Sequence, residues 1–167
     1  IVGAIVETVA EVADCIVSVD IRNYAYNRNI DMDPFKMCHC GGIVGCAVGE
    51  SQSNIVKISN CSNSGTLENK RSTAAGIVGY LYGKSSVSRC KAFATLIQNV
   101  GSTANEQMHV GMGLIAGIST AGSTISDCGV GGTLNTGSAG KVQNVIMTVT
   151  SDNFGNCIVG DGNVTPS

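Results

Sequence analysis

The phrase Ile58-Ser59-Asn60-Cys61, with Thr66-Leu67 beginning five residues after its cysteine, decides the fold because the chain repeats it. Four full copies of the phrase end at Cys15, Cys61, Cys90 and Cys128, and Phe154-Gly155-Asn156-Cys157 resembles a worn fifth copy. A short apolar run precedes each full copy: Ile1-Val2-Gly3, Gly42-Ile43-Val44-Gly45, Gly76-Ile77-Val78-Gly79 and Gly113-Leu114-Ile115-Ala116. Repetition at a period of a few tens of residues predicts stacked copies of one supersecondary unit.

The segment after each phrase cysteine alternates in polarity, which is the pattern of a strand with one buried face. One parity is small or apolar in three copies: Cys15, Val17, Val19 and Ile21; Cys90, Ala92, Ala94 and Leu96; Cys128, Val130, Gly132 and Leu134. The copies therefore predict a core ladder whose apolar ends are Ile21, Leu67, Leu96 and Leu134.

A helix is the alternative for the N-terminal copy. Ile5, Val9, Val12 and Ile16 would line one face of such a helix. The later copies argue against it, because glycines and β-branched residues interrupt the equivalent segments.

Stacked strands of this kind predict an all-β chain folded as a β-solenoid, or parallel β-helix, with equivalent positions about 4.8 Å apart. The polar insertions at residues 23–40, 49–54 and 98–111 are expected to be surface loops. We expect one domain over residues 1–167, built from about four irregular coils. The expected coils are residues 1–40, 41–74, 75–110 and 111–140, with a partial coil at 141–167.

The order Gly-Gly-Ile-Val-Gly, a polar turn, Ile-Ser-Asn-Cys and then Gly-Thr-Leu resembles the GLUG-type repeat of large secreted and surface-attached proteins, adhesins among them. The segment from Gly41 to Leu67 matches best, and that from Ala75 to Leu96 nearly as well. The copy at Gly113 has Ala116 in place of the last glycine of its run. The resemblance implies a solenoid at the cell surface or outside the cell, and it supplies no catalytic residues.

Composition agrees with a solenoid and narrows the classes of function. Only 13% of the residues are charged and 4% are aromatic, whereas 22 of 167 are glycine, which tight corners require. A net charge of -2 without a basic run argues against nucleic acid as a partner. No apolar stretch approaches the ~20 residues of a membrane-spanning helix, so we expect no membrane insertion.

The eight cysteines pose a choice between core packing and disulfides. We expect the four phrase cysteines to be buried, stacked and reduced, because parallel Cβ vectors on stacked strands would strain a disulfide. Cys38, Cys40 and Cys46 break the ladder pattern and lie in or beside the longest insertion. These three are candidates for a disulfide that ties the loop to the body.

Catalysis and metal binding have little support in the sequence. His39 and His109 are the only histidines, and no Gly-x-Ser-x-Gly motif or paired-carboxylate signal is present, so we expect no enzyme. Cys38-His39-Cys40 lacks a second ligand pair at zinc-site spacing. Residues 27–33 alternate like calcium ligands but lack the mid-loop glycine and terminal glutamate. We therefore expect no cofactor and no metal.

Surface positions offer further candidates. Tyr80 and Tyr82 share a strand face and could stack on a sugar, although amphipathic surface tyrosines are the more ordinary interpretation. Asn60 and Asn163 begin Asn-x-Ser/Thr sequences and are candidate glycosylation sites if a eukaryote secretes the chain. The residues before the phrase cysteines are expected to form a mixed outward row: Asp14, Asn60, Arg89 and Asp127.

The termini indicate how the chain functions. The first copy enters directly at its apolar strand, so the coil edge at Ile1, Val2 and Ile5 is expected to lack a cap. An open coil edge is a template for another strand. The chain is thus expected either to continue in a longer repeat protein or to stack end to end, through this edge and residues 145–159, into a filament.

These observations predict an extracellular or cell-surface module with a structural or adhesive role. Its expected partners are further copies of itself and glycans or proteins of a host or matrix. A carbohydrate-binding or polysaccharide-active β-solenoid is the alternative, and it predicts carboxylates and aromatic rings gathered in one groove.

Overall fold

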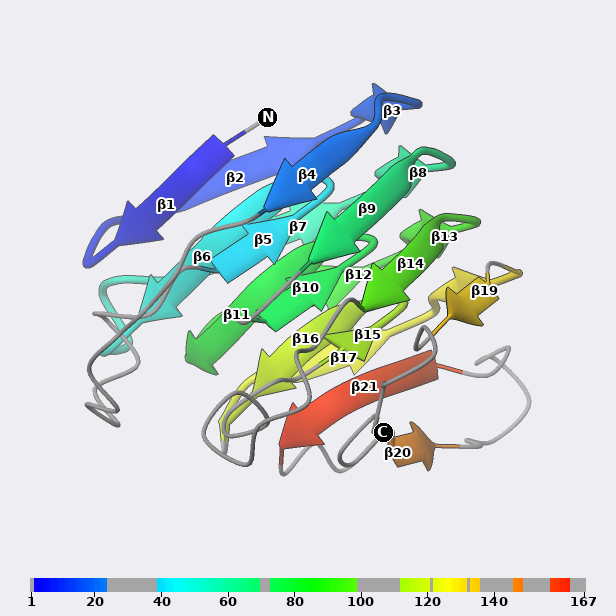
Figure 1. Cartoon of the computed structure of the whole chain (residues 1–167). Coiled ribbons are helices and arrows are strands. Elements are labelled where there is room, and N and C mark those ends of the chain that lie inside the picture. Colours follow the sequence, from blue (N-terminus) through cyan, green and yellow to red (C-terminus); the bar gives the residue numbers. More distant parts are fainter. Residues whose placement is uncertain are drawn as a thin grey trace.

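The chain folds as a stack of parallel strands. The computed structural model describes residues 2–23, 39–69, 73–98, 112–120, 122–131, 133–135, 146–148 and 157–162. Every regular element in these ranges is a strand, so the helical alternative for the N-terminal copy is wrong. No helix there is long and apolar enough to cross a membrane. Figure 1 shows the strands in successive layers, and the chain is a β-solenoid, as the repeat predicts.

The strands are short, and corners follow one another after a few residues. The first coil contains β1 (Val2–Val6), β2 (Ala10–Ala13), β3 (Ile16–Val17), β4 (Ile21–Asn23) and β5 (His39–Gly41). The second contains β6 (Val44–Gly49), β7 (Val56–Ser59), β8 (Ser62–Asn63), β9 (Thr66–Asn69) and β10 (Thr73–Ala75). The third contains β11 (Val78–Gly83), β12 (Ser86–Ser88), β13 (Lys91–Ala92), β14 (Thr95–Gln98) and β15 (Met112–Gly113). The fourth contains β16 (Ala116–Ser119), β17 (Thr124–Ser126), β18 (Gly129–Val130) and β19 (Thr133–Asn135), and β20 (Ile146–Thr148) and β21 (Cys157–Gly162) follow it.

Equivalent strands of successive coils pair side by side and form five sheets. Sheet A contains β1, β6, β11, β16, β21 and β20; sheet B contains β2, β7, β12 and β17; sheet C contains β3, β8, β13 and β18; sheet D contains β4, β9, β14 and β19; sheet E contains β5, β10 and β15. All pairs are parallel except that of β20 with β21. The register does not shift between coils, since Ile58 lies opposite both Val12 and Val87.

The register corrects two details of the predicted repeat. Ala116 lies opposite Val78, so Gly117 takes the last glycine position of the fourth apolar run. Val159 lies opposite Ala116, which makes the segment around Val159 a fifth apolar run rather than a fifth cysteine phrase. The sequence misled here because apolar residues replace one another freely, whereas the hydrogen-bond register fixes the alignment.

The core consists of apolar ladders that run along the stack. In sheet D, Leu67 and Leu96 are fully buried and lie opposite one another, and Leu134 lies opposite Leu96. Ile21 lies opposite Leu67 but is only partly buried, because it belongs to the first coil. Each inner coil thus removes apolar area from water on both of its sides, at roughly 25 cal/mol per Å².

Val19 departs from the predicted inward parity. It is 56% exposed, whereas Ala94, two coils further on, is fully buried. Val19 lies at the corner between β3 and β4 of the first coil. Val17 of the same coil is buried, but the neighbour of Val19 in the second coil is Gly65, which has no side chain to pack against it.

Candidate functional site: the open edge of the first coil

The first coil forms the outer edge of all five sheets. Within the described part of the chain, β1 to β5 each pair with a neighbour on one side only. Figure 1 shows β1 to β4 in blue at the top of the stack. Edge strands carry N–H and C=O groups without strand partners, so this edge is a template for another strand.

Backbone hydrogen bonds identify which groups face the open edge. The Ser62 amide donates to the Cys15 carbonyl at 2.7 Å, and the Lys91 amide donates to the Cys61 carbonyl at 2.8 Å. Ile16 lies opposite Ser62 and occupies the same position one coil earlier. Because the amides of a strand point alternately to its two neighbours, the Ile16 amide points to the open edge.

Val2 and Ile5 belong to the edge strand β1, but they hold it to the second coil. The Val2 amide donates to the Ile43 carbonyl at 2.9 Å. Ile5 lies opposite Ala47 and its side chain is part of the core. These two residues therefore anchor β1 to the second coil, whereas the alternate backbone N–H and C=O groups of the strand point to the open edge. Ile1 lies outside the described residues.

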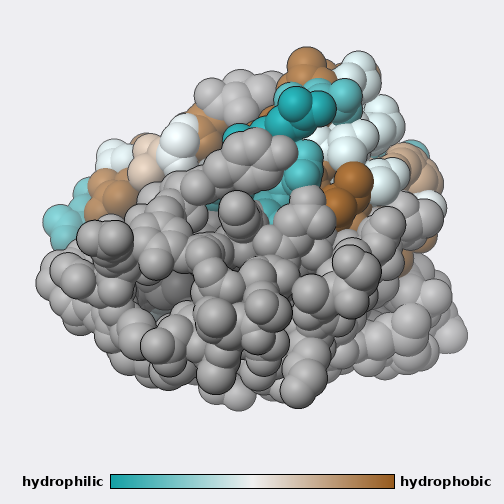
Figure 2. Space-filling model, in the orientation of Figure 1, coloured by the Kyte–Doolittle hydropathy of each residue, from teal (hydrophilic) through white to brown (hydrophobic). Residues whose placement is uncertain are grey.

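Exposed apolar side chains gather on the first coil. Val9 is 72% exposed and Ile16 is 85% exposed, and Val6 and Val19 are also exposed. In the described ranges, Phe93 is the one other large apolar side chain exposed to this degree. Figure 2 shows brown, hydrophobic atoms among polar ones along the top of the molecule, where Figure 1 places this coil. Docking of another coil would remove such area from water.

The phrase cysteines form a ladder at the corner between sheets B and C. The residue before each cysteine has a positive φ, between 52° and 57°: Asp14, Asn60, Arg89 and Asp127. This left-handed conformation turns the chain sharply. Each cysteine thiol then donates to the carbonyl two residues earlier, over 3.1 to 3.3 Å. The four outward residues are all exposed, as predicted, but the sequence did not indicate their backbone strain.

The phrase cysteines are all free thiols. Cys61, Cys90 and Cys128 are buried in the core, as predicted, and Cys15 is partly exposed. Burial raises the pKa of the Cys61 thiol to about 11. At Cys90 the hydrogen bond with the Cys128 thiol lowers the pKa to about 7, against the opposing effect of burial. Both thiols are buried, so a reagent reaches either one only when the stack opens locally.

The candidate disulfide cysteines lie on opposite sides of the solenoid wall. Cys40 faces the core, whereas Cys46 packs in an outer cluster with Val48 and Tyr80. Both are free thiols and cannot bond to one another from these positions. Burial raises the pKa of both, that of Cys46 to about 11. Cys38 lies outside the described residues, so a disulfide to it stays a prediction.

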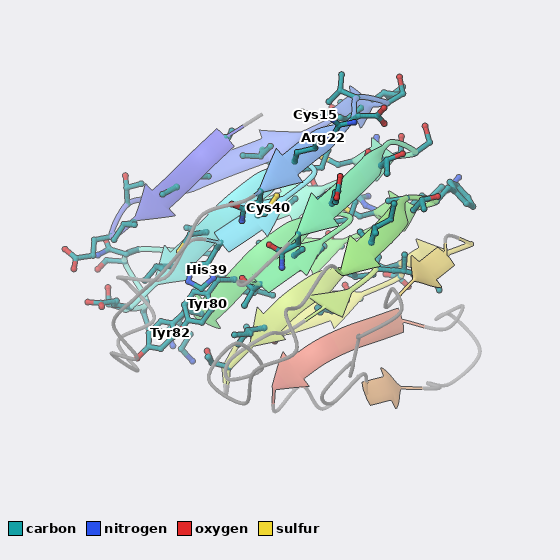
Figure 3. The ribbon with its side chains drawn as sticks, in the orientation of Figure 1. Cys15, Arg22, His39, Cys40, Tyr80 and Tyr82 are labelled. Atoms are coloured by element: carbon teal, nitrogen blue, oxygen red, sulfur yellow. The ribbon has the colours of Figure 1, made fainter. Side chains whose placement is uncertain are left out.

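Tyr80 and Tyr82 share the outer face of sheet A, as their parity predicts. Figure 3 shows Tyr80 between His39 and Tyr82, with ring centroids 4.6 Å and 6.0 Å away and the rings stacked. Tyr80 is only 3% exposed. Because the His39 and Tyr82 rings already stack with the Tyr80 ring, Tyr80 cannot stack on a sugar. Of the two tyrosines, only Tyr82 keeps part of its side chain accessible. His39 is held by a 2.6 Å hydrogen bond between its Nδ1 and Thr73 Oγ1.

The remaining candidates from the sequence are the glycosylation and metal sites. Asn60 is exposed at its corner, and its side-chain amide donates to the Asp14 carboxylate. Asn163 and the calcium-like residues 27–33 lie outside the described ranges. Among the residues inside those ranges, no group of three or more His, Cys, Asp or Glu side chains is arranged to hold a metal ion.

The fold defines the chain as a parallel β-solenoid repeat protein. Comparison with models of known protein families, with curated proteins and with solved structures finds no match. The geometry of the open edge is therefore the basis on which a function can be argued.

Proposed function

We propose that the chain is an extracellular structural or adhesive module that joins end to end with a second copy through the open edge of its first coil. The observation that carries the proposal is that edge strands and exposed apolar side chains occur together on one coil. A second coil would pair the outward backbone groups and cover Val9 and Val19.

The edge that the first coil offers matches the edge that the fourth coil presents. Because the register is unshifted from coil to coil, strands β2, β3 and β4 can follow β17, β18 and β19 as the next members of sheets B, C and D. In sheet A, β21 already pairs with β16 at the level that an added β1 would take beside β2, and β20 lies beyond β21, so end-to-end stacking requires β20 and β21 to move aside. A contact between two different ends that continues the straight stack does not close into a ring, and it therefore yields a filament.

The location outside the cell rests on the GLUG-type resemblance rather than on the geometry. The few charged and aromatic residues and the many glycines agree with a secreted repeat protein but do not require one. The resemblance also allows the partner coil to belong to a longer surface protein, in which case the same edge would be covered by a preceding repeat.

Sedimentation velocity over a concentration series tests the proposal. The chain should form oligomers that lengthen with concentration, and negative-stain images should show rods. Replacing both Val9 and Val19 with Lys puts two charges on the open edge and should leave a folded monomer. Replacing Phe93 with Lys is the matched control, since Phe93 is also exposed but lies on the third coil. A wild-type chain that stays monomeric, or a double variant that still assembles, would contradict the proposal.

Val2→Pro is a poor test of this interface. Proline would remove the amide that donates to the Ile43 carbonyl, so it would weaken the attachment of β1 to the second coil. The lysine substitutions change only exposed side chains and leave every backbone hydrogen bond in place.

A further inference from the structure

A hollow of about 260 Å³ opens on the outside of the solenoid, at the corner between sheets B and C. Its lining comes from three successive coils: Asp14 and Ile16 from the first, Asn60 and Ser62 from the second, and Arg89 and Lys91 from the third. The hollow lies on the outer face, and Cys61 of the cysteine ladder also lines it. No single repeat contains it, because it exists only where the coils stack.

Two cations line this hollow and make no ion pair with an acidic residue of the described ranges. Arg89 and Lys91 are both exposed, and the ion pair found in the described ranges is elsewhere, between Arg22 and Glu68 at 3.5 Å. Asp14 is the carboxylate of the hollow, and the Asn60 amide already donates to it. The lining thus holds two cations against one carboxylate, a formal charge of +1, and Asp127 follows Arg89 in the outward row on the fourth coil.

The stack fixes these groups relative to one another. Arg89 projects from a corner with a φ of 53°. Lys91 lies opposite Ser62 on one side and opposite Gly129 on the other. A β-carbon at Gly129 would meet only Cγ of Lys91, at 3.8 Å, so the space beside the lysine is open. Lys91 therefore stands between two small residues of the neighbouring coils, Ser62 and Gly129.

An exposed aromatic ring continues the same row. Phe93 follows Lys91 by two residues and therefore projects from the same side of the chain. It is 52% exposed. Its ring lies against Gly131 of the next coil, since a β-carbon at Gly131 would be only 2.7 Å from Cδ1 of Phe93. The glycine thus lets the ring rest on the wall while part of it stays in water.

We propose that this surface, the hollow together with Phe93, binds an acidic saccharide. A guanidinium binds a carboxylate through two parallel hydrogen bonds, and an ammonium adds a point charge. The amide of Asn60 and the hydroxyl of Ser62 match sugar hydroxyls. An exposed aromatic ring packs on the apolar face of a sugar ring. This binding site goes beyond the proposed end-to-end assembly, because it lies on the outer face of the stack and spans three coils rather than the edge of the first coil alone.

Isothermal titration calorimetry on the unsubstituted chain, at a concentration where sedimentation shows a monomer, tests the site apart from assembly. The probes are trigalacturonic acid, its neutral methyl ester, a heparin-derived tetrasaccharide and vesicles containing phosphatidylserine. The acidic trisaccharide should bind, more weakly as salt is added, and the ester should not. Tighter binding of the heparin fragment would support the same site with a sulfated glycan as its natural source. Binding of the vesicles alone, or of no saccharide, would overturn the proposal.

Matched arginine variants locate the binding. Arg89→Gln should weaken the acidic trisaccharide about tenfold, the loss expected for one charged hydrogen-bonded contact. Arg22→Gln removes the same charge from sheet D, where Figure 3 shows Arg22 at the top of the molecule, and should leave affinity unchanged. Equal loss in both variants would mean that net charge alone attracts the ligand, which would overturn the site. Thermal unfolding of each variant confirms that it is folded.

Discussion

The first and third coils carry the same repeated phrase, but their surroundings differ. Leu96 of the third coil has a strand neighbour on both sides and is fully buried, whereas Ile21 of the first coil has one neighbour and is partly exposed. The same holds for Cys90 and Cys15. Burial is thus a property of the stack and not of the repeat, so a coil is stabilised mainly by its interfaces with neighbouring coils.

Truncating a residue of the apolar ladder should give the largest difference in stability between the first and third coils. Leu96→Ala should lower the free energy of unfolding by about 2–5 kcal/mol, because neighbours on both sides prevent the cavity from collapsing. Ile21→Ala removes a similar volume at the open edge and should cost clearly less. Denaturant unfolding of both variants measures the difference. A change within about ±0.5 kcal/mol at Leu96 would contradict its place in the core.

Two glycines at the same position of the apolar run should behave differently. A β-carbon at Gly79 would lie 2.7 Å from the Gly45 carbonyl oxygen and 2.8 Å from the Cys40 amide nitrogen, whereas one at Gly3 meets nothing within 4 Å. Gly79→Ala should therefore destabilise by about 1–3 kcal/mol through overpacking, and Gly3→Ala should be nearly neutral. Equal unfolding midpoints for the two variants would show that the coils are not in this close register.

The cysteine ladder offers a comparison without mutation. In the native protein, alkylation should modify Cys15 first, because its thiol is partly exposed. Cys61 and Cys128 are buried, and their labelling needs local opening of the stack. Their labelling rates should therefore be lower than that of Cys15 by a factor of about 100 or more. Peptide mass spectrometry after timed labelling gives the order. Recovery of a disulfide-linked peptide containing Cys61 and Cys90 would contradict the reduced ladder.

The sequence predicts the solenoid because the fold depends on one short pattern that recurs. Apolar parity after Cys90 correctly places Ala92, Ala94 and Leu96 in the core. Parity cannot show what packs against an outer face, and so it did not reveal that Tyr80 is buried between His39 and Tyr82.

Register is the second property that sequence reasoning could not supply. The hollow around Arg89 and Lys91 joins residues of three coils, and their meeting depends on which residues lie opposite one another. The positive φ at Arg89 was equally hidden, because arginine has no special preference for that conformation. The corner imposes it through the backbone ladder, in which the Arg89 amide donates to the Ser126 carbonyl at 3.0 Å.

Hydrogen exchange of single amides tests the open edge most directly. Ser62 and Lys91 donate to carbonyls of the preceding coil, whereas Ile16 occupies the same position with no described coil before it. In dilute solution, NMR should show slow exchange at Ser62 and Lys91 and fast exchange at Ile16. On concentration into assemblies, the Ile16 amide should become protected as well. Equal protection of all three amides in the dilute monomer, or an Ile16 amide that stays unprotected in the assembled state, would contradict the open, template-like first coil.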